Sequence, residues 1–273
     1  MAATITKAPK LGQHFLSDPG AAKKIVESLG DVSKAIVIEI GPGRGAITKL
    51  LQKRAGKLIA IEYDRKLSAL LKYDLLNAEN FELIEADVLS VDFQALLRGK
   101  DPATPVKIVG NLPYYITSDI LLKLFAASVS GIFEQLVVMV QKEVADRLAA
   151  APGSRDYGLL SATAQMHARV RKLFVLPPGA FSPAPKVYSA VVEMRMAPRF
   201  SELGVDALCF DRFLKLLFGQ KRKTILNNLK NEYDDPLSRN ALEEAKIAAS
   251  ARAETVSLEK MAKLYRNLSP AEG

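Results

Sequence analysis

Short apolar runs alternate with amphipathic stretches over the first half of the chain. The apolar runs are typical of buried strands, and they cover residues 35–40, 57–62, 81–87, 106–111 and 135–140. The spacing of apolar residues predicts helices between them at residues 45–55, 64–75 and 118–128. Strands that alternate with helices predict a doubly wound, parallel sheet with helices on both faces.

The pattern changes after residue 150. Residues 151–158 are rich in turn formers, and a helix is expected at 159–168. A proline-rich connection joins two expected strands, 169–176 and 188–196, which predicts an antiparallel addition at one end of the sheet. After a linker at 197–200, the spacing predicts only helices, at residues 206–233, 241–250 and 257–268.

These elements predict an α/β fold followed by a small all-helical domain. We expect a flexible basic arm at residues 1–10, an α/β domain at 11–198 and a helical domain at 199–273. The length of 273 residues is sufficient for such a division.

Charge points to the kind of partner. Lys and Arg number 38 against 30 Asp and Glu, which gives a net charge of +8. This balance favours a polyanionic partner, such as nucleic acid or an anionic membrane surface.

Cysteine and histidine are scarce. Cys209 is the only cysteine, so no disulfide forms within the chain, and this is typical of a reducing compartment. His14 and His167 are the only histidines, so a Cys/His metal site is not expected. The sequence has no apolar run of membrane-spanning length and no secretory signal at its start, so we expect a cytoplasmic protein without a membrane partner.

A glycine-rich loop follows the first expected strand. Glu39, Gly41, Gly43 and Gly45 mark it, and such glycines permit a tight turn and a close approach of a ligand to the backbone. The alternative is a strand-to-helix turn that binds nothing. The G-x-G-x-G spacing differs from the G-x-G-x-x-G fingerprint of dinucleotide sites, which argues against NAD.

Carboxylates end the next two expected strands. Glu62 follows Gly41 by 21 residues and is placed to accept hydrogen bonds from the two hydroxyls of a ribose. Asp87 can accept a hydrogen bond from an adenine amino group. The alternatives are a solvated Glu62 and an Asp87 that caps a turn. Taken together, the three strand ends predict a pocket for an adenosine-bearing cofactor without a required pyrophosphate.

The fourth expected strand ends in Asn111, Leu112, Pro113 and Tyr114, after Gly110, which we expect to let the backbone turn. The Asn111 side-chain oxygen and a nearby backbone carbonyl can accept both hydrogens of an exocyclic amine, and Tyr114 can stack on the base. Accepting both hydrogens draws the nitrogen lone pair out of ring conjugation. The alternative is a buried tyrosine beside an asparagine turn.

Six motifs in order carry a resemblance to a known family. They are "GQHFLSD" (12–18), "EIGPGRGAIT" (39–48), "IAIEYD" (59–64), "EADVL" (85–89), "NLPYYIT" (111–117) and "FSPAPKV" (181–187). From about residue 10 to the C-terminus, the chain resembles the ribosomal RNA adenine dimethyltransferases, and most closely those that act on the small subunit.

The resemblance implies a methyltransferase that depends on S-adenosylmethionine. It implies a Rossmann-like class I fold, with a seven-stranded, mostly parallel sheet and a helical C-terminal domain. The implied substrate is a pair of adjacent adenosines in the 3′-terminal hairpin loop of small-subunit (16S) ribosomal RNA within a pre-ribosomal particle, each dimethylated on its exocyclic amine. We expect the enzyme to act as a monomer in ribosome biogenesis.

The resemblance also implies residue roles at the cofactor end. His14 and Leu16 close the cofactor site. Gly41 lies beside the methionine moiety, Glu62 holds the ribose and Asp87 holds the adenine.

At the target end, the resemblance implies that Asn111 joins the cofactor and target sites. Leu112 offers its backbone there. Tyr114 and Phe181 would sandwich the flipped target base.

Basic residues gather at Lys221, Arg222, Lys223 and Lys230, on an expected helix. Phosphate contacts with RNA are one interpretation of this cluster, and a solvated helix face is the other. Residues 169–172 are a second basic candidate.

Three other functions remain open from the sequence. The related enzymes that methylate one adenine of large-subunit RNA and confer macrolide resistance share much of this pattern. An RNA-binding assembly factor with an idle cofactor fold is a non-catalytic alternative. A dehydrogenase linked to NAD is the most distant.

Overall fold

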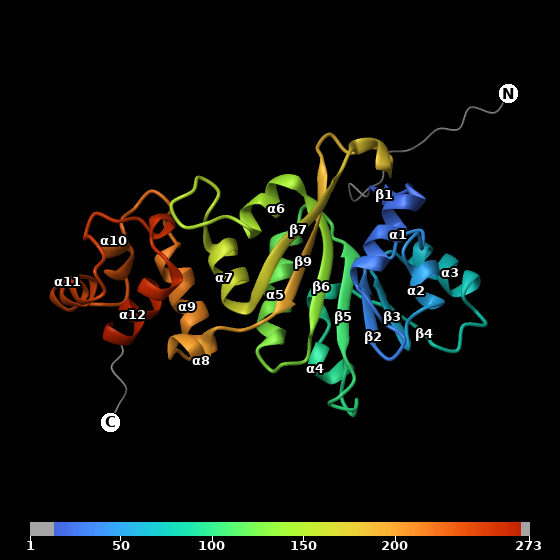
Figure 1. Ribbon diagram of the computed structural model, residues 1–273, viewed down its shortest axis with the longest axis horizontal. Coiled ribbons are helices and arrows are strands. Elements are labelled where there is room, and N and C mark those ends of the chain that lie inside the picture. The colour runs from blue at the N-terminus through green and yellow to red at the C-terminus, as the bar shows by residue number, and fades with distance from the viewer. Residues whose placement is uncertain (1–13, 269–273) are drawn as a thin grey trace. The chain divides into compact units, whose positions relative to one another are not determined.

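The computed structural model describes residues 14–268 (Figure 1), so the basic arm expected at residues 1–10 lies outside the described residues. Contacts between Cα atoms divide the chain into two compact units. Of the described residues, the first contains 14–120, 133–142 and 172–193. The second contains 121–132, 143–171 and 194–268. The domain boundary expected at residue 199 stays a prediction.

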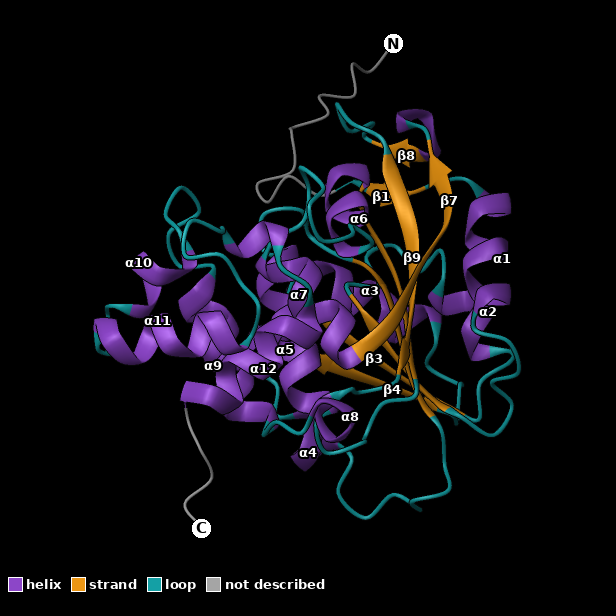
Figure 2. Cartoon of the chain, turned by 60° about the vertical axis from the view of Figure 1, so that its left-hand side comes forward, coloured by secondary structure: helices purple, strands orange, loops and turns teal. Residues whose placement is uncertain are grey.

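A seven-stranded sheet in the order β4-β3-β2-β5-β6-β9-β7 confirms the expected α/β architecture. Its last two strands occupy one end of the sheet, where the addition was expected. A separate two-stranded ladder joins β1 and β8 (Figure 2). The strands are β1 Phe15–Leu16, β2 Ile36–Ile40, β3 Lys57–Glu62, β4 Phe81–Glu85, β5 Val106–Asn111, β6 Gln135–Gln141, β7 Ala168–Leu176, β8 Phe181–Ser182 and β9 Ser189–Met196.

The predicted helices occur in the expected order with different lengths, and the helices Pro19–Ser28, Phe93–Leu96, Lys142–Leu148 and Phe200–Leu203 were not predicted from the sequence. The helix expected at residues 45–55 is reduced to a short α2, because the glycine loop extends further than the apolar spacing indicates. The helices are α1 Pro19–Ser28, α2 Thr48–Gln52, α3 Arg65–Asp74, α4 Phe93–Leu96, α5 Thr117–Ser128, α6 Lys142–Leu148, α7 Leu159–His167, α8 Phe200–Leu203, α9 Ala207–Leu217, α10 Ile225–Leu229, α11 Asp235–Glu244 and α12 Leu258–Leu268. Single 3-10 turns cover Val88–Ser90, Pro178–Ala180 and Ala253–Thr255.

The five strands of the first half pair in parallel. Ile40 of β2 lies opposite Ile61 of β3 and Gly110 of β5, and Asn111 lies opposite Met139 of β6. Parallel strands that are buried on both faces have continuous apolar sequences, as β2 and β5 have here. The register brings the carboxyl ends of β2, β3, β4 and β5 to one edge of the sheet.

Gly110 does not begin a turn as expected, because β5 continues through Asn111. Its role is close packing between strands. A Cβ atom at position 110 would lie 2.4 Å from the backbone oxygen of Ile40, far inside van der Waals contact. Glycine therefore lets β5 approach β2 just before the edge that carries the strand ends.

The core of the first unit joins helices α1 and α2 to the sheet. Ile25 and Val26 of α1 and Leu51 of α2 belong to one buried cluster with Val37 and Val109 of the central strands. The Asp18 carboxylate caps α1 by accepting a hydrogen bond from the backbone N–H of Ala21. The cap fixes where the chain turns from β1 into the helix.

The second unit has its own helical core. Phe210, Phe213 and Leu214 recur at helical spacing on α9 and are buried in one cluster with Met261 and Leu264 of α12. This arrangement agrees with the helices expected after residue 206.

The prediction of a single helix over residues 206–233 is wrong, because a loop divides this region into two helices. Helix α9 ends at Leu217, and α10 begins at Ile225 after the Thr224 hydroxyl has capped it at the backbone N–H of Asn227. Lys221, Arg222 and Lys223 therefore lie in an exposed loop rather than on a helix. Likewise, the helix expected at residues 241–250 is α11, Asp235–Glu244.

Among residues 14–268, no helix is long and apolar enough to cross a membrane.

We expect Gly110→Ala to lower the free energy of unfolding by ~1–3 kcal/mol, because the added methyl group overpacks the contact between β5 and β2. The measurement is urea-induced unfolding. Gly179→Ala is the matched control, since a Cβ at position 179 would meet no atom within 4 Å. Equal stabilities of the two variants would contradict the close-packing role.

Candidate active site

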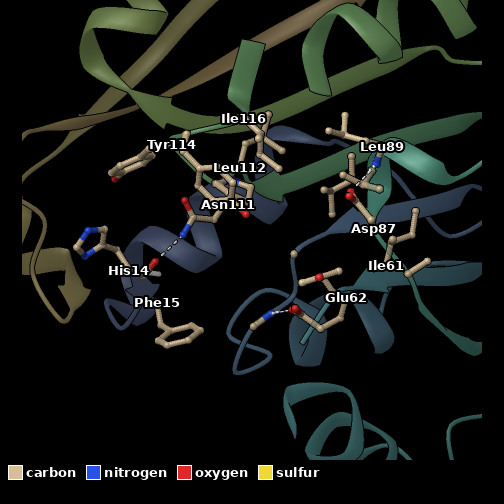
Figure 3. Close-up of a pocket in the computed structure, with 18 residues that line it drawn as sticks. His14, Phe15, Ile61, Glu62, Asp87, Leu89, Asn111, Leu112, Tyr114 and Ile116 are labelled. Carbon is tan, nitrogen blue, oxygen red and sulfur yellow. Dashed lines mark hydrogen bonds between the residues drawn. The ribbon is translucent and has the colours of Figure 1, made fainter. Parts of the chain in front are cut away.

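A cavity of about 280 Å³ lies at the edge of the sheet where the strand ends meet (Figure 3). All of its lining residues belong to the first unit. Nine residues singled out from the sequence line it, namely His14, Gly41, Gly43, Glu62, Asp87, Asn111, Leu112, Pro113 and Tyr114. In Figure 3, Asn111 lies between two groups of side chains, with His14 and Tyr114 on one side and Glu62 and Asp87 on the other.

Glu62, at the end of β3, is only 4% exposed. Its Oε2 accepts a hydrogen bond from the backbone N–H of Gly43 at 3.0 Å, and Oε1 accepts one from Asp64 at 2.9 Å. Burial raises the pKa of this carboxyl, and the two backbone donors oppose the shift. Each oxygen has a second lone pair, so the carboxylate can still accept hydrogen bonds from a ligand hydroxyl.

The glycine loop confirms the expected tight turn. Gly41 and Gly43 both have positive φ, 67° and 57°. A Cβ at position 43 would lie 2.9 Å from the Phe15 ring, and one at position 41 would lie 3.5 Å from the backbone oxygen of Asn111. The Arg44 guanidinium lies over the same Phe15 ring, 4.6 Å from its centre. The loop therefore presents backbone rather than side chains at this wall of the cavity.

Asp87 caps a turn, as one of its two sequence interpretations predicts, and contact with an adenine stays a prediction. Its carboxylate accepts a hydrogen bond from the backbone N–H of Leu89 at 2.9 Å, which caps the 3-10 turn Val88–Ser90. The same residue is exposed and lines the cavity. Ile61, Val88 and Leu89 supply apolar walls next to it, so this end suits a flat ring with a donor at its rim.

Asn111 has one half of its amide engaged and the other half not. Nδ2 donates a hydrogen bond to the backbone oxygen of His14 at 2.8 Å. Oδ1 is buried, and it has no hydrogen-bond partner among the described residues. A buried acceptor without a partner costs free energy unless a ligand supplies a donor. Asn111 is therefore prepared to accept a hydrogen bond inside the cavity.

Tyr114 forms a firm wall at the same end. Its hydroxyl and that of Ser189 are hydrogen-bonded at 2.7 Å, and its ring centre lies 5.7 Å from that of His14. Burial raises the pKa of Tyr114, and the bond with Ser189 opposes the shift. The phenol thus stays neutral and offers a ring face for stacking.

Leu16 and Phe181 do not line this cavity. They lie opposite each other in the β1–β8 ladder, and both are buried, at 7% and 4% exposure. Leu16 lines a neighbouring space of about 30 Å³ with Glu39 and Asn111, whereas Phe181 packs in the core of the first unit. The sandwich of a base between Phe181 and Tyr114 therefore stays a prediction, because Phe181 does not line the cavity in this structure. Lys221, Arg222 and Lys223 are exposed in the second unit.

Sequence reasoning missed several apolar lining residues. Phe15, Tyr63, Leu89 and Tyr115 all line the cavity. Each directly follows, or lies within two positions of, a polar residue that was singled out. Their place in the sequence could have identified them, because residues that directly follow the end of a strand lie at the same edge of the sheet.

Glu39 is a buried carboxyl beside the site, at 2% exposure. Burial raises the pKa of Glu39 to about 8, outweighing the lowering by the Thr48 hydroxyl, and the Glu62 carboxylate adds to the rise. At neutral pH this group is therefore mostly protonated, and the site carries less negative charge than its sequence suggests.

The cavity has two chemically different ends. The end with Glu62 and Asp87 has acceptors above apolar walls, which suits an adenosine. The end with Asn111 and Tyr114 has an unpartnered acceptor beside an aromatic face, which suits a second base that carries an amine. Two such ligands in one cavity are arranged for transfer of a group between them.

The chain is similar to known proteins over nearly all of its length. A sequence model of the family described as ribosomal RNA adenine dimethylase matches residues 5–269. The ribosomal RNA small subunit methyltransferase A of Koribacter versatilis is 55% identical, and the match covers 96% of this chain and 94% of that protein. The protein of the same name from Acidobacterium capsulatum is 54% identical over 95% of this chain and 90% of its own length.

Two solved structures share the fold. A dimethyladenosine transferase from Plasmodium falciparum superimposes with a TM-score of 0.76 at 26% identity, covering 92% of this chain and 96% of that one. The 23S rRNA methyltransferase ErmE superimposes with a TM-score of 0.66 at 25% identity, covering 93% and 99%. These likenesses confirm the Rossmann-like class I fold with its helical C-terminal part.

The raised pKa of Glu39 predicts a pH dependence of stability. Above about pH 4.5 the unfolded chain loses the Glu39 proton, whereas the folded chain keeps it up to about pH 8, so stability falls as pH rises through this window. Glu39→Gln removes this contribution. Relative to the unsubstituted protein, the variant should gain up to ~1.4 kcal/mol per pH unit between pH 5 and 8.

Urea unfolding at pH 5, 6, 7 and 8 measures this difference. Glu79→Gln is the control, because Glu79 is exposed and should give a curve parallel to that of the unsubstituted protein. A parallel curve for Glu39→Gln would show that Glu39 ionises normally in the fold.

Proposed function

The chain belongs to the ribosomal RNA adenine dimethylase family, and we propose that it is the S-adenosylmethionine-dependent enzyme that dimethylates two adjacent adenosines in the 3′-terminal hairpin loop of small-subunit (16S) rRNA. The observation that carries the proposal is the buried, unpartnered Oδ1 of Asn111 in the same cavity as Glu62 and Asp87. It provides an acceptor for an amine next to acceptors for an adenosine.

The residues present fit S-adenosylmethionine. Glu62 keeps lone pairs for the ribose hydroxyls, and Asp87 accepts from the adenine amine. At Gly41 the wall lacks a side chain, which leaves room for the methionine moiety. Leu16 and His14 belong to the segment that closes this site. When bound, the cofactor supplies an electrophilic methyl group on a sulfonium.

At the target end, the chain's own residues orient the amine. Asn111 Oδ1 and the Leu112 carbonyl accept its two hydrogens, so the nitrogen lone pair turns out of the plane of the base. Tyr114 holds the base by stacking. The proton of the methylated nitrogen is acidic and leaves to solvent, so no general base is assigned. Positioning and exclusion of water are the main contributions of the enzyme.

Target bases must be unstacked to reach this end. Flipping costs about a few kcal/mol in a duplex and less in a hairpin loop, which supports a loop target. A sandwich of the base between Tyr114 and Phe181 stays a prediction, and it requires Phe181 to leave the core in which it packs.

The small-subunit substrate is favoured over the large-subunit alternative. The two bacterial relatives at 55% and 54% identity both carry the small-subunit name, whereas ErmE is 25% identical. A non-catalytic assembly factor is disfavoured because Glu62, Asp87 and Asn111 are all present and share one cavity.

The proposed partner is the rRNA within a pre-ribosomal small subunit. The exposed loop with Lys221, Arg222 and Lys223 would contact its phosphates. The enzyme would act in the cytoplasm, and as a monomer, because one chain supplies every residue that lines the cavity.

Transfer of labelled methyl groups to undermethylated small subunits tests the function. We expect incorporation into two adjacent adenosines, located by mass mapping of RNA fragments. Label in large-subunit RNA would favour the alternative enzyme, and absence of label in either subunit would reject both.

Two substitutions should separate the ends of the cavity. Asn111→Ala should slow single-turnover transfer by about 100-fold or more, the scale of one preorganised hydrogen bond at a reacting centre, while the cofactor still binds. Glu62→Gln should weaken cofactor binding by about tenfold or more, because its amide has only one acceptor oxygen for the donors that Glu62 serves. Calorimetric titration and rapid-quench kinetics measure the two effects. An Asn111→Ala variant that lost cofactor affinity with an unchanged transfer rate would refute the role of Asn111. A Glu62→Gln variant that lost transfer rate with unchanged cofactor affinity would refute the role of Glu62.

Replacing Lys221, Arg222 and Lys223 with Ala should reduce the slope of log K for RNA against log salt by up to about 2, at roughly 0.7 per phosphate contact. Binding is measured by filter retention at several salt concentrations. The matched control replaces Lys34, Lys53 and Arg54, which are exposed and precede β2 and β3 at the opposite edge of the sheet from the cavity. Equal slopes for both triple variants would show that the loop does not contact RNA phosphates and that its charges are simply solvated.

A further inference from the structure

The segment His14–Asp18, which we call the N-terminal strap, is fastened along the side of the cavity. Phe15 pairs with Ser182 and Leu16 with Phe181 in the β1–β8 ladder. The backbone N–H of Ser17 donates to the oxygen of Ala180 at 2.9 Å. A segment that is distant in sequence from both β5 and the proline-rich connection is thus held against the site.

The ladder cannot continue through Pro183, because proline has no N–H. The His14 side chain takes over, with Nδ1 lying 2.8 Å from the Pro183 oxygen. A carbonyl oxygen can only accept, so Nδ1 must carry the hydrogen and donate it. This bond anchors His14, the end of the strap nearest the target end of the cavity.

The backbone oxygen of the same residue decides how the Asn111 amide is turned. It accepts from Asn111 Nδ2 at 2.8 Å, so the NH2 group faces the strap. Oδ1 consequently points the other way, toward the side of Tyr114 in Figure 3. A flipped amide would place two oxygen atoms face to face at this distance, which is repulsive. Without His14 in place, the terminal torsion of an asparagine is broad and roughly two-fold.

We propose that His14 is a positioning residue for the transfer reaction, whose anchored backbone oxygen keeps Asn111 Oδ1 aimed at the target amine. The proposal rests on the proposed function, because only an incoming amine needs Oδ1 in that direction. Release of the anchor lowers the fraction of bound complexes with a competent amide. The rate of transfer then falls even at saturating cofactor and RNA, where a change in cofactor affinity has no effect on the rate.

Three substitutions at position 14 separate the anchor from the ring. His14→Asn loses the ring but keeps an N–H donor near the place of Nδ1, so we expect a single-turnover rate within about twofold of the unsubstituted protein. The Asp side chain of His14→Asp has the shape of asparagine but carries only acceptors, and the Leu side chain of His14→Leu has neither donor nor acceptor. Transfer by both variants should be about tenfold slower, which corresponds to ~1.4 kcal/mol. Tyr73→Ala removes an 81% exposed tyrosine from α3 and should leave the rate unchanged.

A double-mutant cycle tests the path through Asn111. If the strap acts by orienting the amide, His14→Asp should cost little more once Asn111→Ala has removed that amide. Equal costs in both backgrounds would overturn the proposal. So would a loss in cofactor affinity with an unchanged rate at saturation, or a His14→Asn variant as slow as His14→Asp.

A readout without turnover completes the test. In protein labelled with 15N-asparagine, the side-chain NH2 signal of Asn111, assigned by its loss in Asn111→Ala, should be sharp in the unsubstituted protein and in His14→Asn. It should be broadened or shifted in His14→Asp. An unchanged signal in His14→Asp would overturn the positioning role. Absence of transfer by the unsubstituted protein, with the expected NMR changes, would instead reject the proposed function.

Discussion

Parallel pairing of the strands β4, β3, β2 and β5 is the constraint on which the rest of the structure depends. In this register, Ile40, Glu62, Glu85 and Asn111 end neighbouring strands at one edge. Residues far apart in the sequence therefore meet without any loop having to carry them there. The close contact of Gly110 with the Ile40 backbone lies one residue before this edge, so the spacing of the central strands is set where the chemistry needs it.

Polar groups that are buried at this edge need hydrogen-bond partners, and at Glu62 the partners are backbone N–H groups. The Glu62 carboxylate takes its hydrogen bonds from Gly43 and Asp64, which hold it in place without neutralising charges. Glu39, which lacks such donors, keeps its proton instead, with a pKa raised by burial to about 8. Burial raises the pKa of both carboxyl groups, and only at Glu62 do backbone donors oppose that rise.

Local pattern predicts most of this fold, because buried parallel strands and amphipathic helices have distinct periodicities. It also placed Gly41, Glu62, Asp87 and Asn111 in one cavity, since strand ends share an edge. The pattern of apolar residues failed where a single polar side chain determines the start of a helix. Thr224 restarts a helix that apolar spacing alone would continue from α9, so the Lys221 loop was expected to be helical. It failed again where a contact is long-range. Nothing near Phe181 in the sequence indicates its pairing with Leu16, which buries the side chain in the core.

The two ends of the cavity are joined by one continuous series of contacts. Glu62 holds the backbone of Gly43, and Gly43 lies so close to Phe15 that a Cβ would not fit between them. The next residue toward the N-terminus, His14, holds the amide of Asn111. A shift of the glycine loop would therefore move the strap as well, and with it the acceptor at the target end. Because close-packed elements shift together rather than deform independently, the geometry for an adenosine at one end and for an amine at the other is set by the same few residues.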